Sequence, residues 1–192
     1  MESCECALAK QLALEELPDA YFKYMACAIA FFVTDDMNES LRIVKPILND
    51  SSEFMYNYDS DLTKRCHNLF TRLVELMTEA SGGQFFMTVW HILHIAPVLA
   101  SHRNDYMLEY LYKDYIFDTL NCVSCISHYI GHFTTAPKDL LDGSNNDQLC
   151  NFIHNLHNDV RSIKGKTHVT KEDSNRVCEY IIKKVNTFLP TQ

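Results

Sequence analysis

The sequence predicts an all-helical protein, and three observations support this fold class. Gly and Pro, the residues that most often punctuate sheets and tight turns, each occur only five times among 192 residues. Alternation of β-branched with polar residues is scarce, whereas apolar residues recur at three- and four-residue spacing. The length suits one compact domain, or one domain with a small helical addition.

Composition and charge argue against several kinds of partner. A formal net charge of −8 at pH 7 gives no basic footprint for nucleic acid or for an anionic membrane. The longest strongly apolar run, 25–33, is far shorter than a bilayer span. Glu2, Cys4 and Glu5 stand where a signal peptide would be basic. We therefore expect a cytosolic or nuclear protein that binds neither nucleic acid nor membrane.

Residues 1–82 are expected to form an additional N-terminal helical region. Asp19 is a good N-cap for one helix, and Asp35-Asp36 opens the next, which Pro46 kinks or shortens. Gly82-Gly83 ends the last long helix of this region and marks the expected domain boundary. The helices of the region are expected at about 7–17, 19–33, 35–48 and 62–80.

The second unit, residues 83–192, is also expected to be helical. Asn121 can cap a helix that begins at Cys122, and Thr170 can cap the last helix, because an acidic residue follows three positions later. The polar stretch 133–146 contains Pro and Gly and is expected to be a loop. Helices are expected from 85 to a bend at 97, at about 104–120, from 122, and at about 148–164 and 170–188.

Two cysteines two residues apart, Cys122 and Cys125, form the first candidate site. Eight Cys in a chain without an export signal indicate metal binding, catalysis or core thiols rather than a disulfide framework. At the start of a helix the exposed N–H groups favour a thiolate, and Cys125 lies one turn after Cys122. The pair is thus able to form a redox disulfide, or else consists of two buried thiols. No βαβ pattern is present, which excludes a thioredoxin-like fold.

Two groups of polar and aromatic residues flank the dithiol in the sequence. Trp90 and His94 share one helix face, and His154 and Asn158 share another, with Asn155 beside them. Such residues can stack on and hydrogen-bond a flat cofactor. The alternatives are a core Trp beside a hydrogen-bonded His, and polar residues that bind water at the surface.

The ordered combination Trp-x-x-x-His, Cys-x-x-Cys and His-Asn-x-x-Asn resembles the flavin-linked sulfhydryl oxidases of the Erv/ALR type. The resemblance covers about 83–166, with His157 in place of the family's usual Val. It is closest to the baculovirus-type viral branch, in which Cys-x-x-Cys is also followed by x-x-His-Tyr, here Cys125 to Tyr129. This resemblance implies a virus of arthropods, or a relative of one, as the source.

The resemblance implies a four-helix bundle that holds FAD, followed by a short fifth helix, and a homodimer. Cys125 would be the flavin-proximal cysteine, and Cys122 would exchange with protein dithiol substrates. Electrons would pass through this pair and the flavin to O₂, giving H₂O₂. The flavin and adenine would be lined by Trp90, His94, His154, Asn155 and Asn158. Lys164 is the best candidate to neutralise the FAD phosphates, ahead of Arg161 and Lys166.

The resemblance also implies viral protein substrates, in the host cytoplasm or nucleus or in virions. Cys4 and Cys6 are candidates for a shuttle pair that passes electrons to the redox dithiol, as in many relatives. Cys150 and Cys178 are candidates for a structural disulfide found in many cellular members of the family. Their spacing is longer than in that pattern, and the bond is left open.

Two other functions fit parts of the same sequence. Cys122 and Cys125 with His154 and His157 would give the Cys₂His₂ ligand set of a structural zinc site. Such a site would not need Trp90 or the Asn residues. The second alternative is a non-enzymatic helical interaction protein.

Overall fold

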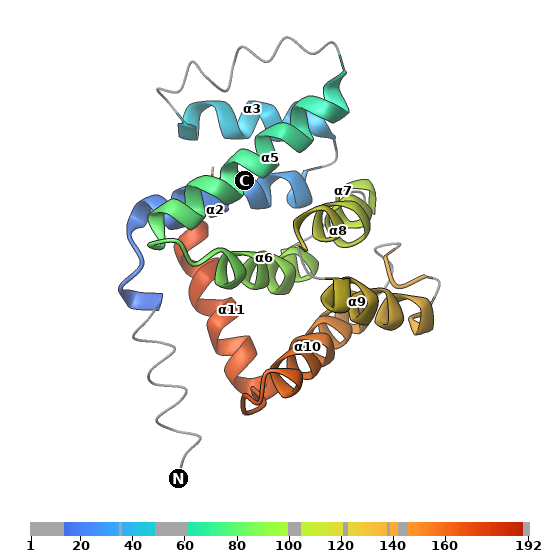
Figure 1. The fold of residues 1–192 in the computed structure, drawn as a ribbon. Coiled ribbons are helices and arrows are strands. Elements are labelled where there is room, and N and C mark those ends of the chain that lie inside the picture. The colour runs from blue at the N-terminus through green and yellow to red at the C-terminus, as the bar shows by residue number, and fades with distance from the viewer. Residues whose placement is uncertain are drawn as a thin grey trace.

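The structure is a computed structural model of the chain and describes residues 14–34, 36–48, 61–99, 105–120, 123–137, 139–141 and 146–189. All regular secondary structure in these ranges is helical, which confirms the predicted all-α class (Figure 1). In the same ranges, no helix has the length and apolar character needed to cross a bilayer. Cys4, Cys6, Asn121 and Cys122 lie outside the described residues.

The N-terminal helical region contains three long helices in its described part. Asp61 caps the last of them by accepting hydrogen bonds from the backbone N–H groups of Thr63 and Lys64, at 3.0 and 3.4 Å. Asp19, the expected N-cap of the first, is instead its first helical residue, and Pro18 occupies the N-cap position. The helices are α2 (Asp19–Val33), α3 (Met37–Leu48) and α5 (Leu62–Ala80).

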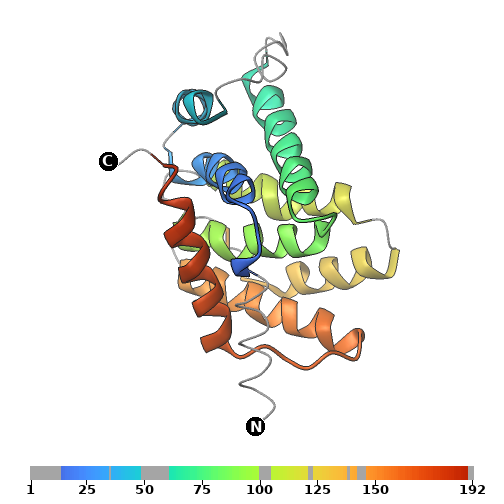
Figure 2. The same cartoon turned by 90° about the vertical axis from the view of Figure 1, so that its left-hand side faces the viewer.

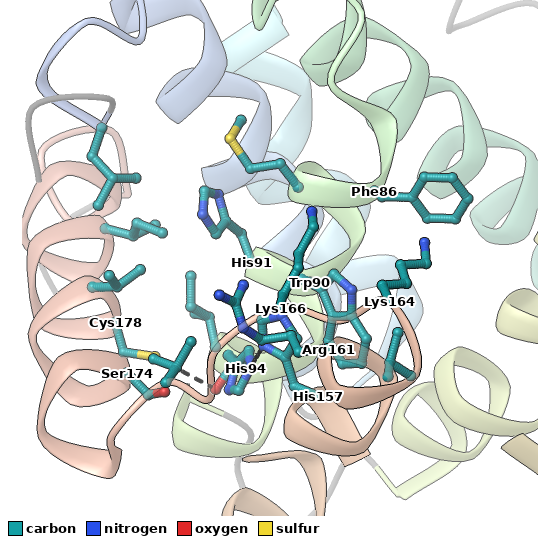
Figure 3. Close-up of a pocket in the computed structure, with 17 residues that line it drawn as sticks. Phe86, Trp90, His91, His94, His157, Arg161, Lys164, Lys166, Ser174 and Cys178 are labelled. Carbon is teal, nitrogen blue, oxygen red and sulfur yellow. Dashed lines mark hydrogen bonds between the residues drawn. The ribbon is translucent and has the colours of Figure 1, made fainter. Parts of the chain in front are cut away.

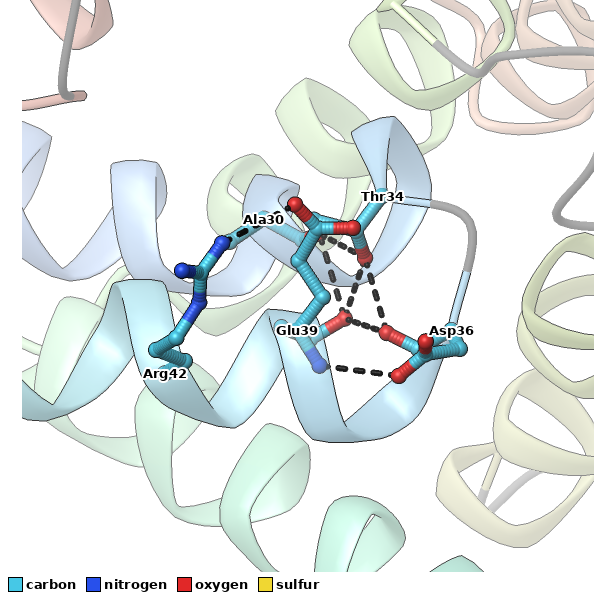
Figure 4. A network of polar contacts seen from close by, with 6 residues as sticks. Ala30, Thr34, Asp36, Glu39 and Arg42 are labelled. Atoms are coloured by element: carbon cyan, nitrogen blue, oxygen red, sulfur yellow. Dashed lines mark hydrogen bonds and ion pairs between the residues drawn. The ribbon is translucent and has the colours of Figure 1, made fainter.

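A buried hydroxyl pair joins the end of α2 to the start of α3 (Figure 4). Thr34 Oγ1 and Ser40 Oγ are hydrogen-bonded to each other, and Thr34 also donates to the carbonyl of Ala30 at 3.0 Å. Asp36 accepts from the backbone N–H of Glu39 at 2.9 Å and so caps α3. These contacts satisfy polar groups at both helix ends and fix the angle between the two helices.

Gly82 and Gly83 separate α5 from α6 (Phe85–Leu99). Their φ values of 71° and 88° lie in the left-handed region that favours glycine, which confirms the predicted helix end. The predicted domain boundary falls at this turn. Residues of both predicted units nevertheless belong to one continuous hydrophobic cluster, and the division into two domains remains a prediction.

The helix expected at 104–120 is present but contains a π-helical segment. It runs as α7 (Asp105–Glu109), η1 (Tyr110–Tyr115) and α8 (Ile116–Thr119). Within this segment, the Tyr112 hydroxyl donates to the carbonyl of Leu93 at 2.6 Å. The backbone carbonyl of Tyr112 accepts from the Tyr129 hydroxyl at 2.7 Å. These buried bonds connect the segment to α6 and to the following helix.

Three helices complete the chain: α9 (Val123–Thr135), α10 (Asn146–Ile163) and α11 (Lys171–Val185). The loop expected from residue 133 begins later, because the Phe133 ring packs on Phe152 of α10 with centroids 4.8 Å apart and so extends α9. The Thr170 side chain caps α11 by accepting from the backbone N–H of Asp173, as predicted. α11 has fifteen residues and lies within the predicted range 170–188, although it is longer than the short fifth helix that the resemblance implies.

α6 lies at the centre of this arrangement (Figure 2). α2 and α5 pack on one side of it, and α10 and α11 pack on the other. α2 also contacts α11 and α7, so the N-terminal region reaches several of the helices that follow Gly83. The N-terminal region is therefore part of the surroundings of α6.

Phe70 of α5 is fully buried against Phe31, Phe32 and Tyr115, the last with ring centroids 5.1 Å apart. We expect Phe70→Ala to lower the free energy of unfolding by about 3–5 kcal/mol, because it leaves a cavity in the core. Urea denaturation would measure this. Phe86→Ala is the control, because Phe86 is exposed and should change stability by less than about 0.5 kcal/mol. Equal losses in both variants would contradict the packing described.

Candidate functional site

A cavity of about 350 Å³ lies between α6, α10 and α11 and is the candidate functional site (Figure 3). Its volume is at the low end of the range for small-molecule sites. The lining combines apolar residues with a set of aromatic and imidazole side chains and a set of cationic side chains. Leu14, which precedes α2, also lines it. The aromatic and imidazole side chains of the lining are Phe86, Trp90, His91, His94 and His157.

Helical spacing explains how the side chains converge. Trp90 and His94 are four residues apart on α6 and therefore share a face. His157 and Arg161 are four apart on α10, and Lys164 follows one turn later just beyond the helix. α6 and α10 pack against each other, so these two faces meet across the cavity.

An aromatic cluster forms one wall of the cavity. The His157 ring stacks on Trp90 with centroids 4.1 Å apart and planes 10° apart. His157 Nδ1 is also 3.0 Å from His94 Nε2, a hydrogen bond in which one nitrogen donates. Burial lowers the pKa of His94 to about 4, so this imidazole is neutral at physiological pH. The wall is therefore aromatic, and its Trp90 and His94 side chains carry no charge at physiological pH.

Three cations line the same cavity: Arg161, Lys164 and Lys166. Arg161 Nε donates to the carbonyl of Thr167 at 2.6 Å, and this hydrogen bond holds the guanidinium in place. Lys164 Nζ lies 5.4 Å from the centroid of the Phe86 ring. Among the described residues that line the cavity, none is acidic, although the chain carries a net charge of −8. The cavity thus suits a ligand with a flat ring and an anionic group.

The predicted cofactor-binding residues divide into two groups. Trp90, His94 and Lys164 line the cavity, whereas His154, Asn155 and Asn158 do not. The reason is their position around α10: residues 154 and 158 share a face that differs from the face of 157 and 161. Asn155 is exposed.

His154 and Asn158 instead hold the connection between α10 and α11. His154 Nδ1 is 3.1 Å from Ser174 Oγ, and His154 Nε2 is 3.1 Å from the Asn158 amide nitrogen. Asn158 also donates to the carbonyl of Val169 at 3.0 Å and accepts from its N–H at 2.8 Å. Burial lowers the pKa of His154, as expected for a neutral hydrogen-bonded imidazole. These bonds position α11, which is a wall of the cavity.

Cys125 lies on α9 and is half-buried. It does not line the cavity. Helix α9 meets α10 through another residue, because His132 Nε2 is 3.2 Å from an oxygen of Asp159. Asp159 and Arg161 lie on roughly opposite sides of α10. Asp159 contacts α9 and Arg161 lines the cavity, so α10 lies between α9 and the cavity.

The structure separates the two His residues of the zinc hypothesis. His157 contacts Trp90 and His94, and His154 contacts Ser174 and Asn158. In the part of the chain that the structure describes, no three His, Cys, Asp or Glu side chains form a metal-binding group. Cys122, which that hypothesis also requires, is outside this part.

Cys150 and Cys178 are free thiols in the structure. Burial raises the pKa of Cys178 to about 12, and it also raises that of Cys150, which disfavours the thiolate form of both. Cys178 lines the cavity, and its Sγ lies 4.0 Å from the carbonyl oxygen of His94 as a weak donor.

Sequence reasoning missed two imidazoles of the cavity, His91 and His157. The spacing of His157, Arg161 and Lys164 was the available signal, because residues at i, i+4 and i+7 line one helix face. His91 is three residues before His94 on the same helix, so helical spacing offered a signal for it too.

Comparisons of the chain with models of protein families, with curated proteins and with solved structures found no match. The resemblance to the sulfhydryl oxidases therefore rests on the three ordered motifs. The cavity adds information that is independent of those motifs, because its cationic group lies outside them.

Asn155 and Asn158 provide a matched pair of variants. Asn158→Ala should lower the free energy of unfolding by about 1–3 kcal/mol, because it leaves the Val169 backbone groups without their partner. Asn155→Ala, at an exposed position three residues away, should change it by less than about 0.5 kcal/mol. Thermal or urea unfolding measures both. A larger loss for Asn155→Ala would contradict the structural role given to Asn158.

Proposed function

We propose that the chain is an FAD-dependent thiol oxidase that forms disulfide bonds in protein substrates. The observation that carries the proposal is the cavity in which Trp90 and His94 meet three cationic side chains. Trp90 and His94 form the first motif of the resemblance. Flat rings and phosphates are both parts of a dinucleotide, and the cavity offers a surface for each.

The residues of the cavity fit one end of FAD. Trp90 and His157 offer aromatic surface for a flat ring, and Arg161, Lys164 and Lys166 are suited to its pyrophosphate. Because α10 separates the cavity from α9, we assign to it the adenine and phosphate end, which needs no contact with the thiols. Bound FAD would supply the two-electron acceptor that reoxidises the dithiol and delivers the electrons to O₂.

Cys122 and Cys125 would carry out the exchange with substrate. A substrate thiolate attacks the sulfur of Cys122 in the Cys122–Cys125 disulfide, which forms a mixed disulfide and releases the Cys125 thiolate. A second substrate thiolate then attacks the substrate sulfur of the mixed disulfide and releases the Cys122 thiolate. The substrate loses two electrons and the dithiol gains them. The half-buried position of Cys125 is consistent with the inner member of such a pair.

The resemblance also supports the wider biological proposal. It favours a homodimer that acts on viral proteins in the host cytoplasm or nucleus, or in virions. Disulfide formation by an enzyme is needed where thiols are otherwise kept reduced.

A second candidate is a helical protein that binds a nucleotide without thiol chemistry. The position of Cys125 outside the cavity favours it, because ring and phosphate binding there does not require a cysteine. The two candidates share the cavity and differ in the role of the dithiol.

The visible spectrum and one substitution separate the two candidates. We expect the purified chain to show flavin absorption that dithiothreitol bleaches in the absence of oxygen. Cys125→Ala should retain FAD and lose turnover of dithiols, with H₂O₂ release as the assay, because the redox disulfide can no longer form. Ser124→Ala, between the two cysteines, is the control and should retain turnover. FAD binding without turnover in the wild-type chain would favour the second candidate.

The cationic group gives a prediction about affinity. Lys164→Glu should weaken FAD binding by about tenfold, because it replaces a charge-assisted contact with repulsion. Fluorescence titration of the apoprotein with FAD would measure the dissociation constant. Lys183→Glu, on an exposed position of α11 outside the cavity, should leave it unchanged. Similar effects of both substitutions would indicate only long-range charge and would contradict a phosphate site at Lys164.

A further inference from the structure

A buried tyrosine of the N-terminal region contacts the cavity through a histidine. The Tyr21 hydroxyl on α2 lies 2.8 Å from His91 Nδ1 on α6, and the two rings meet edge to face with centroids 6.1 Å apart. Tyr21 is fully buried. His91 lines the cavity beside Trp90, on the part of α6 nearer to α11 (Figure 3).

The protonation state of Tyr21 decides which atom is the donor and which is the acceptor in this hydrogen bond. Burial raises the pKa of Tyr21 well above its ordinary value, so the phenol keeps its proton and requires an acceptor. The Thr88 hydroxyl lies near the same phenol and lowers the pKa of Tyr21 slightly. Its oxygen has no hydrogen-bond partner of good geometry and therefore does not accept the Tyr21 proton. His91 Nδ1 is therefore the acceptor.

An imidazole that accepts at Nδ1 carries its proton at Nε2 when it is neutral. Burial and, to a smaller extent, the nearby His94 lower the pKa of His91 to about 3, so His91 is neutral at physiological pH. Within the described ranges, the structure gives its Nε2 no hydrogen-bond partner. His91 therefore carries one N–H donor, at Nε2, on a side chain that lines the cavity.

We propose that His91 binds the nucleotide ring by donating from Nε2 to an acceptor nitrogen of the adenine, and that Tyr21 is the positioning residue that fixes this tautomer. The proposal rests on the proposed function, which supplies the dinucleotide. It gives the N-terminal region a defined role at the site, since both Tyr21 and Leu14 come from that region.

The packing of α2 agrees with this role. Phe22, the neighbour of Tyr21, packs against Tyr180 of α11 with ring centroids 6.1 Å apart. Lys184 Nζ of α11 lies 5.7 Å from the Phe22 ring. α2 thus contacts two of the three helices that form the cavity, α6 and α11. The hydroxyl of Tyr21 is therefore held by a helix whose position is fixed from both sides.

The test combines FAD titration of the apoprotein with nitrogen NMR of the His91 side chain. Tyr21→Phe and His91→Phe should each weaken FAD binding by about tenfold, because a hydrogen bond to the ring is lost or misdirected. His91→Gln, whose amide nitrogen can occupy the place of Nε2, should restore most of the affinity. Tyr24→Phe, one turn from Tyr21 on α2 and outside the cavity, should bind FAD as the wild type does.

The NMR measurement needs no ligand. It should show the proton of His91 at Nε2 in the wild type and a mixture of tautomers in Tyr21→Phe. A wild type that binds FAD, with unchanged affinity in Tyr21→Phe and His91→Phe, would overturn the role of His91 alone. A wild type that carries the Nε2 proton but binds no FAD would overturn the proposed function and this ligand with it. A proton at Nδ1 in the wild type would overturn the assignment whatever the affinity.

Discussion

Helix α6 packs against four other helices, α2, α5, α10 and α11, and its imidazole side chains have partners inside the protein. Its apolar residues, such as Ile92 and Ile95, are covered by α2, α5, α10 and α11. An unpaired polar group in such surroundings costs free energy, so each imidazole of α6 is matched by a residue from another helix. His91 is matched by Tyr21, and His94 by His157. The cavity lies beside these paired side chains, between α6, α10 and α11.

The fold was largely predictable because its signals are local. The Gly82-Gly83 turn and the Thr170 cap act within a few residues, and both are found where the sequence predicts them. The end of α9 was not predictable, since Phe133 is held in the helix by Phe152 of another helix. The predicted start of α2 differs from the observed one by a single position, because Pro18 and not Asp19 is the N-cap.

The candidate site was predictable only in part, for a related reason. Helical spacing shows that Trp90 shares a face with His94, and His154 with Asn158, but it does not show what each face contacts. The first pair meets a cavity. The second meets the backbone around Val169, which lies in the connection to α11 and satisfies the same hydrogen-bonding groups that a ligand would. A polar pattern on a helix therefore identifies a need for partners without identifying the partners.

The π-helical segment from Tyr110 to Tyr115 has a consequence for how this chain is compared with others. A π turn contains one more residue than an α turn, so the positions after it are rotated by about 100° relative to an uninterrupted helix. If this helix is aligned without a gap, from Asp105 to Thr119, to a straight α-helix of another protein, core positions of one will pair with surface positions of the other on one side of the π-helical segment. A relative with a straight helix here would align correctly only with a one-residue gap within the segment.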